Sequence, residues 1–309
     1  SPGFAVQLVV ENLRKTYPNG VRALDGITLT VGAGMFGLLG PNGAGKSTFM
    51  RTLATLQLPD SGSIRFGDFG SGASAGGGID VLAQPDELRR ILGYLPQEFG
   101  LYPSLSVEVT LDHFAALKGV LNGRQRKGLV TDLLQQTNLH DARRKSVGSL
   151  SGGMKQRLGI AIALAGSPKL LIVDEPTAGL DPTERHRFLN LLAEIGQEIV
   201  VLLSTHIVED VRELCQAIAI VNKGTVILSG DPREIVATLR GKLWRRQVDK
   251  RELPALQASH RVISTQLLAG VPVAHVYAES APPGFEALEP DLEDVYFFHI
   301  NTSERRVAA

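Results

Sequence analysis

The chain has 309 residues, and its 32 basic and 32 acidic side chains give a formal net charge of zero. It therefore lacks the basic excess that is expected of a general nucleic-acid binder. Hydrophobic residues make up 43% of the sequence, which is ample for a core, and the length suits one large domain followed by a small one. The single cysteine, Cys215, excludes an intrachain disulfide and is expected to be buried.

The N-terminal part of the chain contains short runs in which apolar and polar residues alternate, within residues 5–32 and 62–95. Between them, the apolar run Met35–Leu39 predicts a short buried strand, and Thr48–Leu53 continues as a helix. Residues 70–78 are Gly, Ser and Ala only. Because they offer no large apolar side chain to bury, they predict a flexible surface loop, to which we assign no function.

The segment between this strand and this helix fits G-x-x-x-x-G-K-[ST] and predicts a loop that binds nucleotide phosphates. Its glycines let backbone N–H groups turn inward, and the helix N-terminus behind them adds partial positive charge. Lys46 can reach the β- and γ-phosphates, and the hydroxyl of Ser47 can ligate Mg²⁺. The expected nucleotide-binding residues are Gly40, Pro41, Asn42, Gly43, Ala44, Gly45, Lys46, Ser47 and Thr48.

Residues 104–150 predict a helical subdomain, in which Ser106 can cap the first helix. Leu150–Arg157 then forms a second turn of small residues that opens an apolar helix. An anion-binding helix N-terminus is expected at Ser151, Gly152 and Gly153. One nucleotide has little use for two such sites in one subunit. Two subunits packed head to tail would use both, because each would close over the nucleotide of the other; a simple helix cap is the alternative.

Two later apolar runs end in polar residues. Lys169–Val173 leads into Asp174 and Glu175, and Ile199–Thr205 leads into His206. Continuous aliphatic runs are typical of parallel strands that are buried on both faces. Since doubly wound sheets bind ligands at the carboxyl ends of their strands, we expect Asp174 and Glu175 to lie at the ligand site.

The sequence pattern changes near residue 241. A short helix interrupted by proline is expected at residues 250–258. It lies among three predicted strands, which are Leu243–Val248, Arg261–Leu268 and Val271–Ala278. We therefore divide the chain into a large domain, residues 1–240, and a small accessory domain, residues 241–309.

The motifs and their order resemble those of the ATP-binding cassette (ABC) family. The signature of that family is LSGGQ-like, and this chain carries Met154 where glutamine is usual. The resemblance covers residues 6–240 and implies an α/β fold. The implied fold has a P-loop NTPase core with a mostly parallel sheet and an antiparallel β-subdomain that contains the alternating runs. It also has a helical signature subdomain and a small C-terminal α+β appendage. ATP and Mg²⁺ are the implied cofactors.

The resemblance also implies a role for each site residue. Glu175 would polarise the attacking water as general base, Lys46 would bind the phosphates, and His206 would contact the γ-phosphate. Mg²⁺ would be held, directly or through water, by Ser47, Gln97 and Asp174. Tyr17 would stack on adenine; the alternative is an ordinary half-buried tyrosine at a strand end. Asp181 would lie in a loop that contacts the other subunit of the dimer.

No stretch approaches the roughly 18 consecutive apolar residues of a membrane-spanning helix. Together with this observation, the resemblance implies an ATP-hydrolysing subunit, cytoplasmic and peripheral on the inner face of the cell membrane, that drives an integral membrane permease on a separate chain. It would pair as a homodimer or as a heterodimer. The apolar segment Glu98–Pro103 would either dock the permease or pack between subdomains. The signature variant and the ending Leu288–Phe298 resemble those of exporters in this family, so the resemblance favours an exporter.

The alternative from another class is a soluble cassette protein that acts on a ribosome or a nucleic-acid complex. Such relatives usually carry two cassettes or a long coiled-coil insertion. This sequence has one set of motifs and no such insertion. We therefore expect no nucleic-acid partner.

Overall fold

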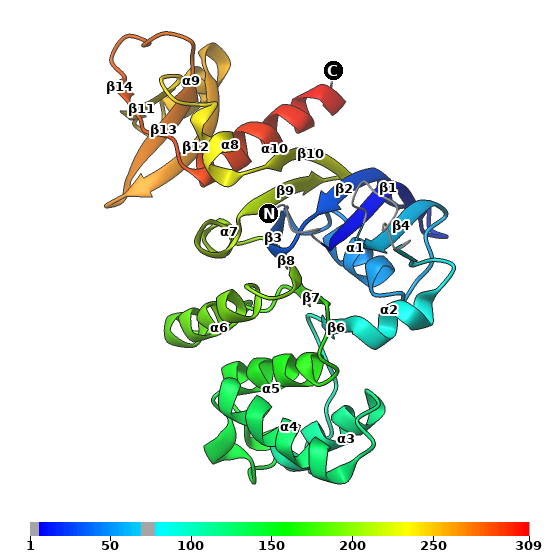
Figure 1. The fold of residues 1–309 in the computed structure, drawn as a ribbon. Helices are drawn as coiled ribbons and strands as arrows, with labels where there is room; N and C mark the ends of the chain where they lie inside the picture. The colour runs from blue at the N-terminus through cyan, green and yellow to red at the C-terminus, as the bar shows by residue number, and fades with distance from the viewer. Residues whose placement is uncertain (1–5, 69–77, 309) are drawn as a thin grey trace, which may run out of the picture.

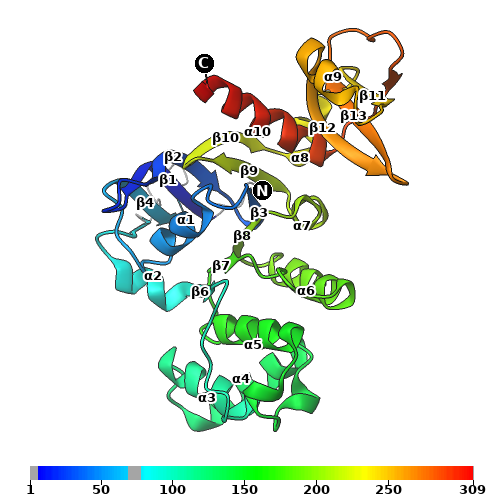
Figure 2. The same ribbon diagram turned by 180° about the vertical axis from the view of Figure 1, so that it is seen from behind.

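The computed structural model describes residues 6–68 and 78–308. The expected Gly/Ser/Ala-rich loop lies outside the described residues, except for Gly78. In Figures 1 and 2 the helical subdomain and the C-terminal sheet lie at opposite ends of the molecule, with the core sheet between them. Within the described residues, no helix combines the length and the hydropathy needed to cross a membrane.

The core sheet has six strands in the order β10-β9-β3-β8-β7-β6. Neighbouring strands run parallel, except in the antiparallel hairpin of β9 and β10. The strands are β3 (Gly34–Leu39), β6 (Leu92–Leu95), β7 (Leu170–Asp174), β8 (Val200–Thr205), β9 (Ala217–Asn222) and β10 (Thr225–Gly230). Every residue of β7 and β8 is buried, as expected of aliphatic strands that are covered on both faces.

Helices cover both faces of the core sheet. Alternate residues of β7 divide between two hydrophobic cores: Ile172 packs with Phe49 of α1, and Leu171 packs with Phe188 of α6. The helices of the core are α1 (Lys46–Leu53), α5 (Gly152–Leu164), α6 (Pro182–Ile195), α7 (Val208–Leu214) and α8 (Pro232–Ala237). This packing places the carboxyl ends of β3, β7 and β8 side by side at one edge of the sheet.

The β-subdomain is an antiparallel sheet with the strand order β2-β1-β4-β5. Its elements are β1 (Gln7–Thr16), β2 (Arg22–Val31), β4 (Ser61–Gly67), β5 (Ile79–Asp80) and helix α2 (Pro85–Ile91). The expected runs within residues 62–95 supply β4 and β5 to this sheet, whereas the end of that range does not join it. Pro85 starts a helix, since its fixed φ suits the first turn. The largely buried strand β6 pairs in parallel with β7 in the core sheet.

The helical subdomain has a hydrophobic core of its own, which joins Leu111 of α3, Leu134 of α4 and Leu158 of α5. Its elements are α3 (Val107–Leu117), α4 (Gly123–Gln136), the 3₁₀ turns His140–Ala142 and Val147–Ser149, and α5. Ser106 caps α3 as predicted, because its Oγ accepts a hydrogen bond from the Val109 N–H at 3.3 Å.

The C-terminal part forms an antiparallel sheet with the strand order β12-β13-β11-β14. Its elements are β11 (Leu243–Gln247), α9 (Leu253–Ser259), β12 (Arg261–Leu268), β13 (Val271–Tyr277), β14 (Glu286–Ala287) and α10 (Leu292–Ala308). Helix α10 returns to the cassette and packs against α7, α8 and β10, beside β10 in both views (Figures 1 and 2). The division of the chain after residue 240 stays a prediction.

Candidate active site

The phosphate-loop segment curls around the side chain of Lys46, the first residue of α1. The ammonium group of Lys46 donates to the carbonyl oxygens of Gly40 at 2.8 Å and Pro41 at 3.2 Å. Gly45, directly before the helix, has a φ of 104°, which L side chains rarely adopt. A Cβ at Gly40 would overlap the backbone of Val221, so both glycines are required by the local geometry.

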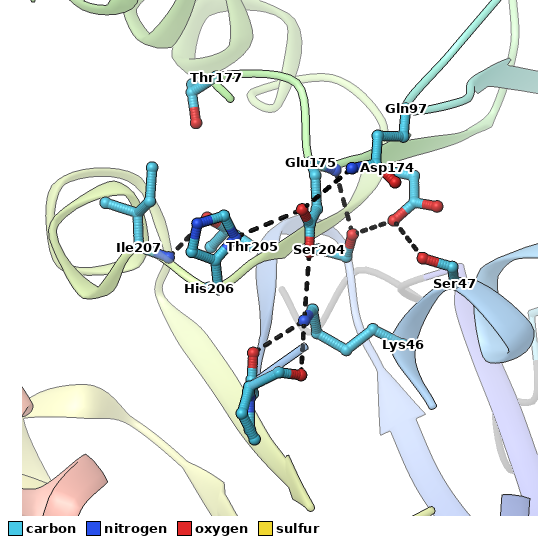
Figure 3. Close-up of polar contacts among 12 residues, drawn as sticks. Lys46, Ser47, Gln97, Asp174, Glu175, Thr177, Ser204, Thr205, His206 and Ile207 are labelled. Carbon is cyan, nitrogen blue, oxygen red and sulfur yellow. Dashed lines mark hydrogen bonds and ion pairs between the residues drawn. The ribbon is translucent and has the colours of Figure 1, made fainter. Parts of the chain in front are cut away.

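Glu175 lies opposite this loop, and three side chains reach its carboxylate. Lys46 Nζ is 3.2 Å from Oε1, Gln97 Nε2 is 3.4 Å from Oε2, and His206 Nδ1 is 3.3 Å from Oε2 (Figure 3). Glu175 and Lys46 are both buried, at 8% and 4% exposure. Charges in such surroundings interact more strongly than charges in water. The structure therefore brings all four predicted catalytic side chains into one cluster.

Glu175 has a φ of 47°, an uncommon backbone conformation for a residue with a side chain. Its N–H is held by Ser204, which accepts through the backbone oxygen at 3.0 Å and through Oγ at 3.2 Å. A strained residue persists only where its surroundings fix it, and such residues cluster at functional sites. Sequence analysis missed Ser204; its only signal is its place at the end of β8, next to Thr205 and His206.

Asp174, the last residue of β7, faces the start of α1. Its Oδ1 accepts hydrogen bonds from the hydroxyl of Ser47, at 3.5 Å, and from the hydroxyl of Ser204 (Figure 3). Burial, followed by the charge of Asp174, raises the pKa of the neighbouring Tyr94, against a smaller opposing effect of Arg51. The carboxylate and hydroxyl oxygens here, with the amide of Gln97 nearby, are the hard donors that Mg²⁺ prefers.

A surface cleft runs from this cluster to Tyr17. The tyrosine hydroxyl lies 3.2 Å from Thr48 Oγ1 and donates to Gln57 Oε1 at 3.1 Å. Gln57 in turn donates to the Thr48 carbonyl oxygen at 2.8 Å, and sequence analysis did not select it. The cleft is lined by Tyr17, Val21, Arg22, Ala23, Asn42, Gly43, Gly45, Lys46, Ser47, Thr48, Gln97 and Glu175.

Two predicted parts of the site lie outside this cleft. Ser151 caps α5, accepting from the Met154 N–H at 3.2 Å, and Asp181 caps α6, accepting from the Glu184 N–H at 3.0 Å. Glu184 also pairs with Arg157 of α5. A Cβ at Gly153 would overlap the Glu184 side chain. The two helix starts are therefore joined to each other, and neither lines the cleft of its own chain.

Comparison with known proteins identifies the family. The family model described as ABC transporter matches residues 24–178 of this chain. YbhF of Escherichia coli K12, named a probable multidrug ABC transporter ATP-binding protein, is 37% identical over 238 residues. These residues make up 76% of this chain and 39% of YbhF, so the chain spans well under half the length of that relative.

Two further similarities cover most of both proteins. YxlF of Bacillus subtilis 168, an uncharacterized ABC transporter ATP-binding protein, is 31% identical over 94% of this chain and 98% of YxlF. The solved dimeric structure of MJ0796, described as a bacterial ABC transporter cassette, has a TM-score of 0.63 and 25% identity, covering 72% of this chain and 98% of MJ0796. On these grounds the chain belongs to the ABC transporter family and contains its ATP-binding cassette.

Proposed function

We propose that this chain is the ATP-hydrolysing subunit of an ABC transporter, which dimerises around two MgATP and drives a separate membrane permease. The observation that carries the proposal is the arrangement of polar side chains at one edge of the core sheet. Lys46, Gln97 and His206 reach the oxygens of Glu175, and Ser47 reaches Asp174 beside it. Phosphoryl transfer needs mainly positioning and neutralisation of charge, which this arrangement can supply.

ATP would lie in the cleft between Tyr17 and the phosphate loop. The Lys46 ammonium group and the backbone N–H groups of the loop would neutralise and orient the phosphates, and the ring of Tyr17 would stack on the base. Base–aromatic stacking contributes about 1–3 kcal/mol. Ser47, Asp174 and Gln97 would hold Mg²⁺, which neutralises developing charge on the β- and γ-oxygens.

Glu175 would accept the proton of the attacking water. Gln97 and His206 both approach the Oε2 atom of this carboxylate, so its orientation depends on them. Replacing Glu175 with Gln keeps the shape of the side chain and removes the base. We expect ATP hydrolysis to fall by about 10²–10⁴-fold, the usual contribution of a positioned base.

This prediction is checked by steady-state phosphate release together with equilibrium binding of a fluorescent ATP analogue. Nucleotide binding should persist in Glu175→Gln. The exposed Glu194 of α6 offers a matched control, because Glu194→Gln makes the same chemical change away from the cleft. Equal turnover in Glu175→Gln and Glu194→Gln would remove Glu175 from its proposed role.

The helix starts at Ser151 and Asp181 would act on the ATP of the other subunit. They do not line the cleft of their own chain, and Glu184 joins them, so they can meet a partner as one surface. The similarity to a dimeric ABC transporter cassette supports a dimer. The second subunit would be either another copy of this chain or a different ATP-binding subunit.

A groove beside the active site would receive the permease. It is lined by Phe99, Leu101, Pro103 and Lys155, among others, and shares Gln97 with the nucleotide cleft. Tyr102, next to it in the sequence, is 67% exposed. A permease segment bound here could therefore act on the nucleotide site through Gln97. The multidrug name of a relative supports export, and a permease partner would place the chain at the inner face of the membrane.

The permease proposal is tested by purifying tagged Glu175→Gln in MgATP from detergent-solubilised cells of the source organism. A polytopic membrane protein should co-purify, and Tyr102→Asp should release it whereas Tyr102→Phe should not. Recovery of ribosomes or DNA-associated proteins without a membrane protein would contradict the transporter function.

A further inference from the structure

A buried carboxylate behind the active site joins three segments of the chain. Asp210 lies on α7 and is 0% exposed. Its Oδ2 accepts hydrogen bonds from the hydroxyls of Thr177, at 2.6 Å, and Thr205, at 3.1 Å. Its Oδ1 accepts from Arg185 Nε at 2.7 Å. An uncompensated carboxylate would be costly at this depth, so these donors define where Asp210 can lie.

Each donor lies within four residues of a proposed active-site residue in the sequence. Thr177 follows Glu175 by two positions, and Arg185 lies in α6, which Asp181 caps. Thr205 directly precedes His206. The Asp210 carboxylate therefore contacts the segment after the proposed base Glu175 and helix α6 after Asp181. It also contacts the residue directly before His206.

The contact with Thr205 bears most directly on His206. The Thr205 hydroxyl accepts a hydrogen bond from the Ile207 N–H at 2.9 Å, which closes the turn around the histidine (Figure 3). The same hydroxyl donates to Asp210. In this arrangement His206 Nδ1 lies 3.3 Å from Glu175 Oε2. His206 itself is exposed, and in the part of the chain that the structure describes its side chain has no other hydrogen bond or ion pair, so its turn must position it.

We propose that Asp210 is a positioning residue for ATP hydrolysis, which holds His206 in place relative to Glu175 and the start of α6. This inference rests on the proposed function. The opposing interpretation is that Asp210 only anchors α7 to α6, which pack together. A pure anchor would affect the free energy of unfolding and leave the geometry of His206 and the catalytic rate unaltered.

Thr177 allows a test with a matched pair of variants. Thr177→Val removes the hydroxyl donor at almost constant shape, and Thr177→Ser keeps it. We expect kcat for ATP to fall about tenfold in Thr177→Val, with little change in KM, because a displaced His206 would stabilise the transition state less, and about 1.4 kcal/mol corresponds to a factor of ten. Thr177→Ser should retain most of the activity. Equal kcat values in the two folded variants would overturn the proposal.

A double-mutant cycle tests whether Asp210 acts through the histidine. Asp210→Asn replaces one carboxylate oxygen, a hydrogen-bond acceptor, with an NH₂ group that cannot accept from the surrounding donors. This variant should therefore lower kcat in the wild-type background. In the His206→Ala background it should lower kcat no further, since residues that act as a unit are not additive. Equal fold losses in both backgrounds would contradict the proposal, and Thr177→Val serves in place of Asp210→Asn if that variant does not fold.

A readout without turnover separates this proposal from the proposed function. The ring signals of ¹⁵N-labelled His206, assigned by their loss in His206→Ala, should shift in Thr177→Val and keep their position in Thr177→Ser. Unshifted signals in Thr177→Val would overturn the role of Asp210. Absence of ATP hydrolysis by the wild-type chain would instead overturn the proposed function, while the His206 signals would still decide the role of Asp210.

Discussion

Replacing Asp294 with alanine should destabilise the C-terminal sheet far more than breaking an exposed ion pair does. Asp294 of α10 lies 2.8 Å from His275 Nδ1 of β13, with side chains that are 4% and 9% exposed. Its other oxygen accepts from the Asp291 N–H at 3.2 Å. Removing one partner of a buried pair costs about 3–5 kcal/mol, because the other partner stays buried without compensation. We therefore expect a loss of about 3 kcal/mol or more.

Glu289→Ala is the matched control. Glu289 pairs with Arg240 at 3.1 Å, but the side chains are 78% and 65% exposed. Pairs of this kind contribute about 0–1 kcal/mol. The difference between the two variants arises from burial, since each change truncates one carboxylate that contacts a basic side chain.

The assay uses the only tryptophan of the chain, Trp244, as an internal reporter. Trp244 lies on β11, which pairs with β13, and its Nε1 donates to the Ala278 oxygen at 3.0 Å. In a urea titration followed by its fluorescence, a loss of 3 kcal/mol should move the midpoint by about 1 M or more, given slopes of about 1–3 kcal/mol/M. Equal midpoints for Asp294→Ala and Glu289→Ala would refute the reasoning. The apolar double variant His275→Leu with Asp294→Leu should lose less than Asp294→Ala.

Two further predictions concern the phosphate loop and the cysteine. Gly40→Ala should abolish binding of a fluorescent ATP analogue, because the new Cβ would overlap the Val221 backbone. Gly32→Ala should bind the analogue normally, because a Cβ there would have no atom within 4 Å. Normal binding by both variants would contradict this prediction. Burial, followed by the charge of Asp210, raises the pKa of Cys215 from 9.0 to about 12. The unfolded thiol ionises first as pH rises, so stability should decline between pH 9 and 12 by up to about 1.4 kcal/mol per pH unit. Urea titrations across this range should show a smaller decline in Cys215→Ala, and parallel curves would refute the assignment.

The parts that sequence predicted well are those whose signal lies in adjacent residues. The aliphatic runs of β7 and β8 and the phosphate-loop motif each hold their whole pattern within a few positions. The strand predicted at Arg261–Leu268 has the bounds of β12 for the same reason. Short apolar runs are ambiguous. Within residues 62–95, the run Leu92–Leu95 forms β6 of the core sheet and not a strand of the β-subdomain, because it pairs with the distant strand β7.

The rest of the site depends on contacts between residues that are far apart in the sequence. Thr177 and Asp210 are separated by 33 positions, and no local pattern marks the carboxylate as shared by three segments. The positive φ of Glu175 follows from the contacts of its N–H with Ser204, 29 positions away. The roles of individual site residues in catalysis stay predictions, although their side chains lie where those roles would require.

In the proposed dimer two chains share each ATP, with Ser151 and Asp181 of one chain facing the phosphate loop of the other. Light scattering of Glu175→Gln during size-exclusion chromatography tests it most directly. In MgATP the variant should elute at twice the monomer mass, and adding Ser151→Arg should return it to the monomer mass. A monomer in saturating MgATP, or a dimer that Ser151→Arg leaves intact, would contradict the shared site.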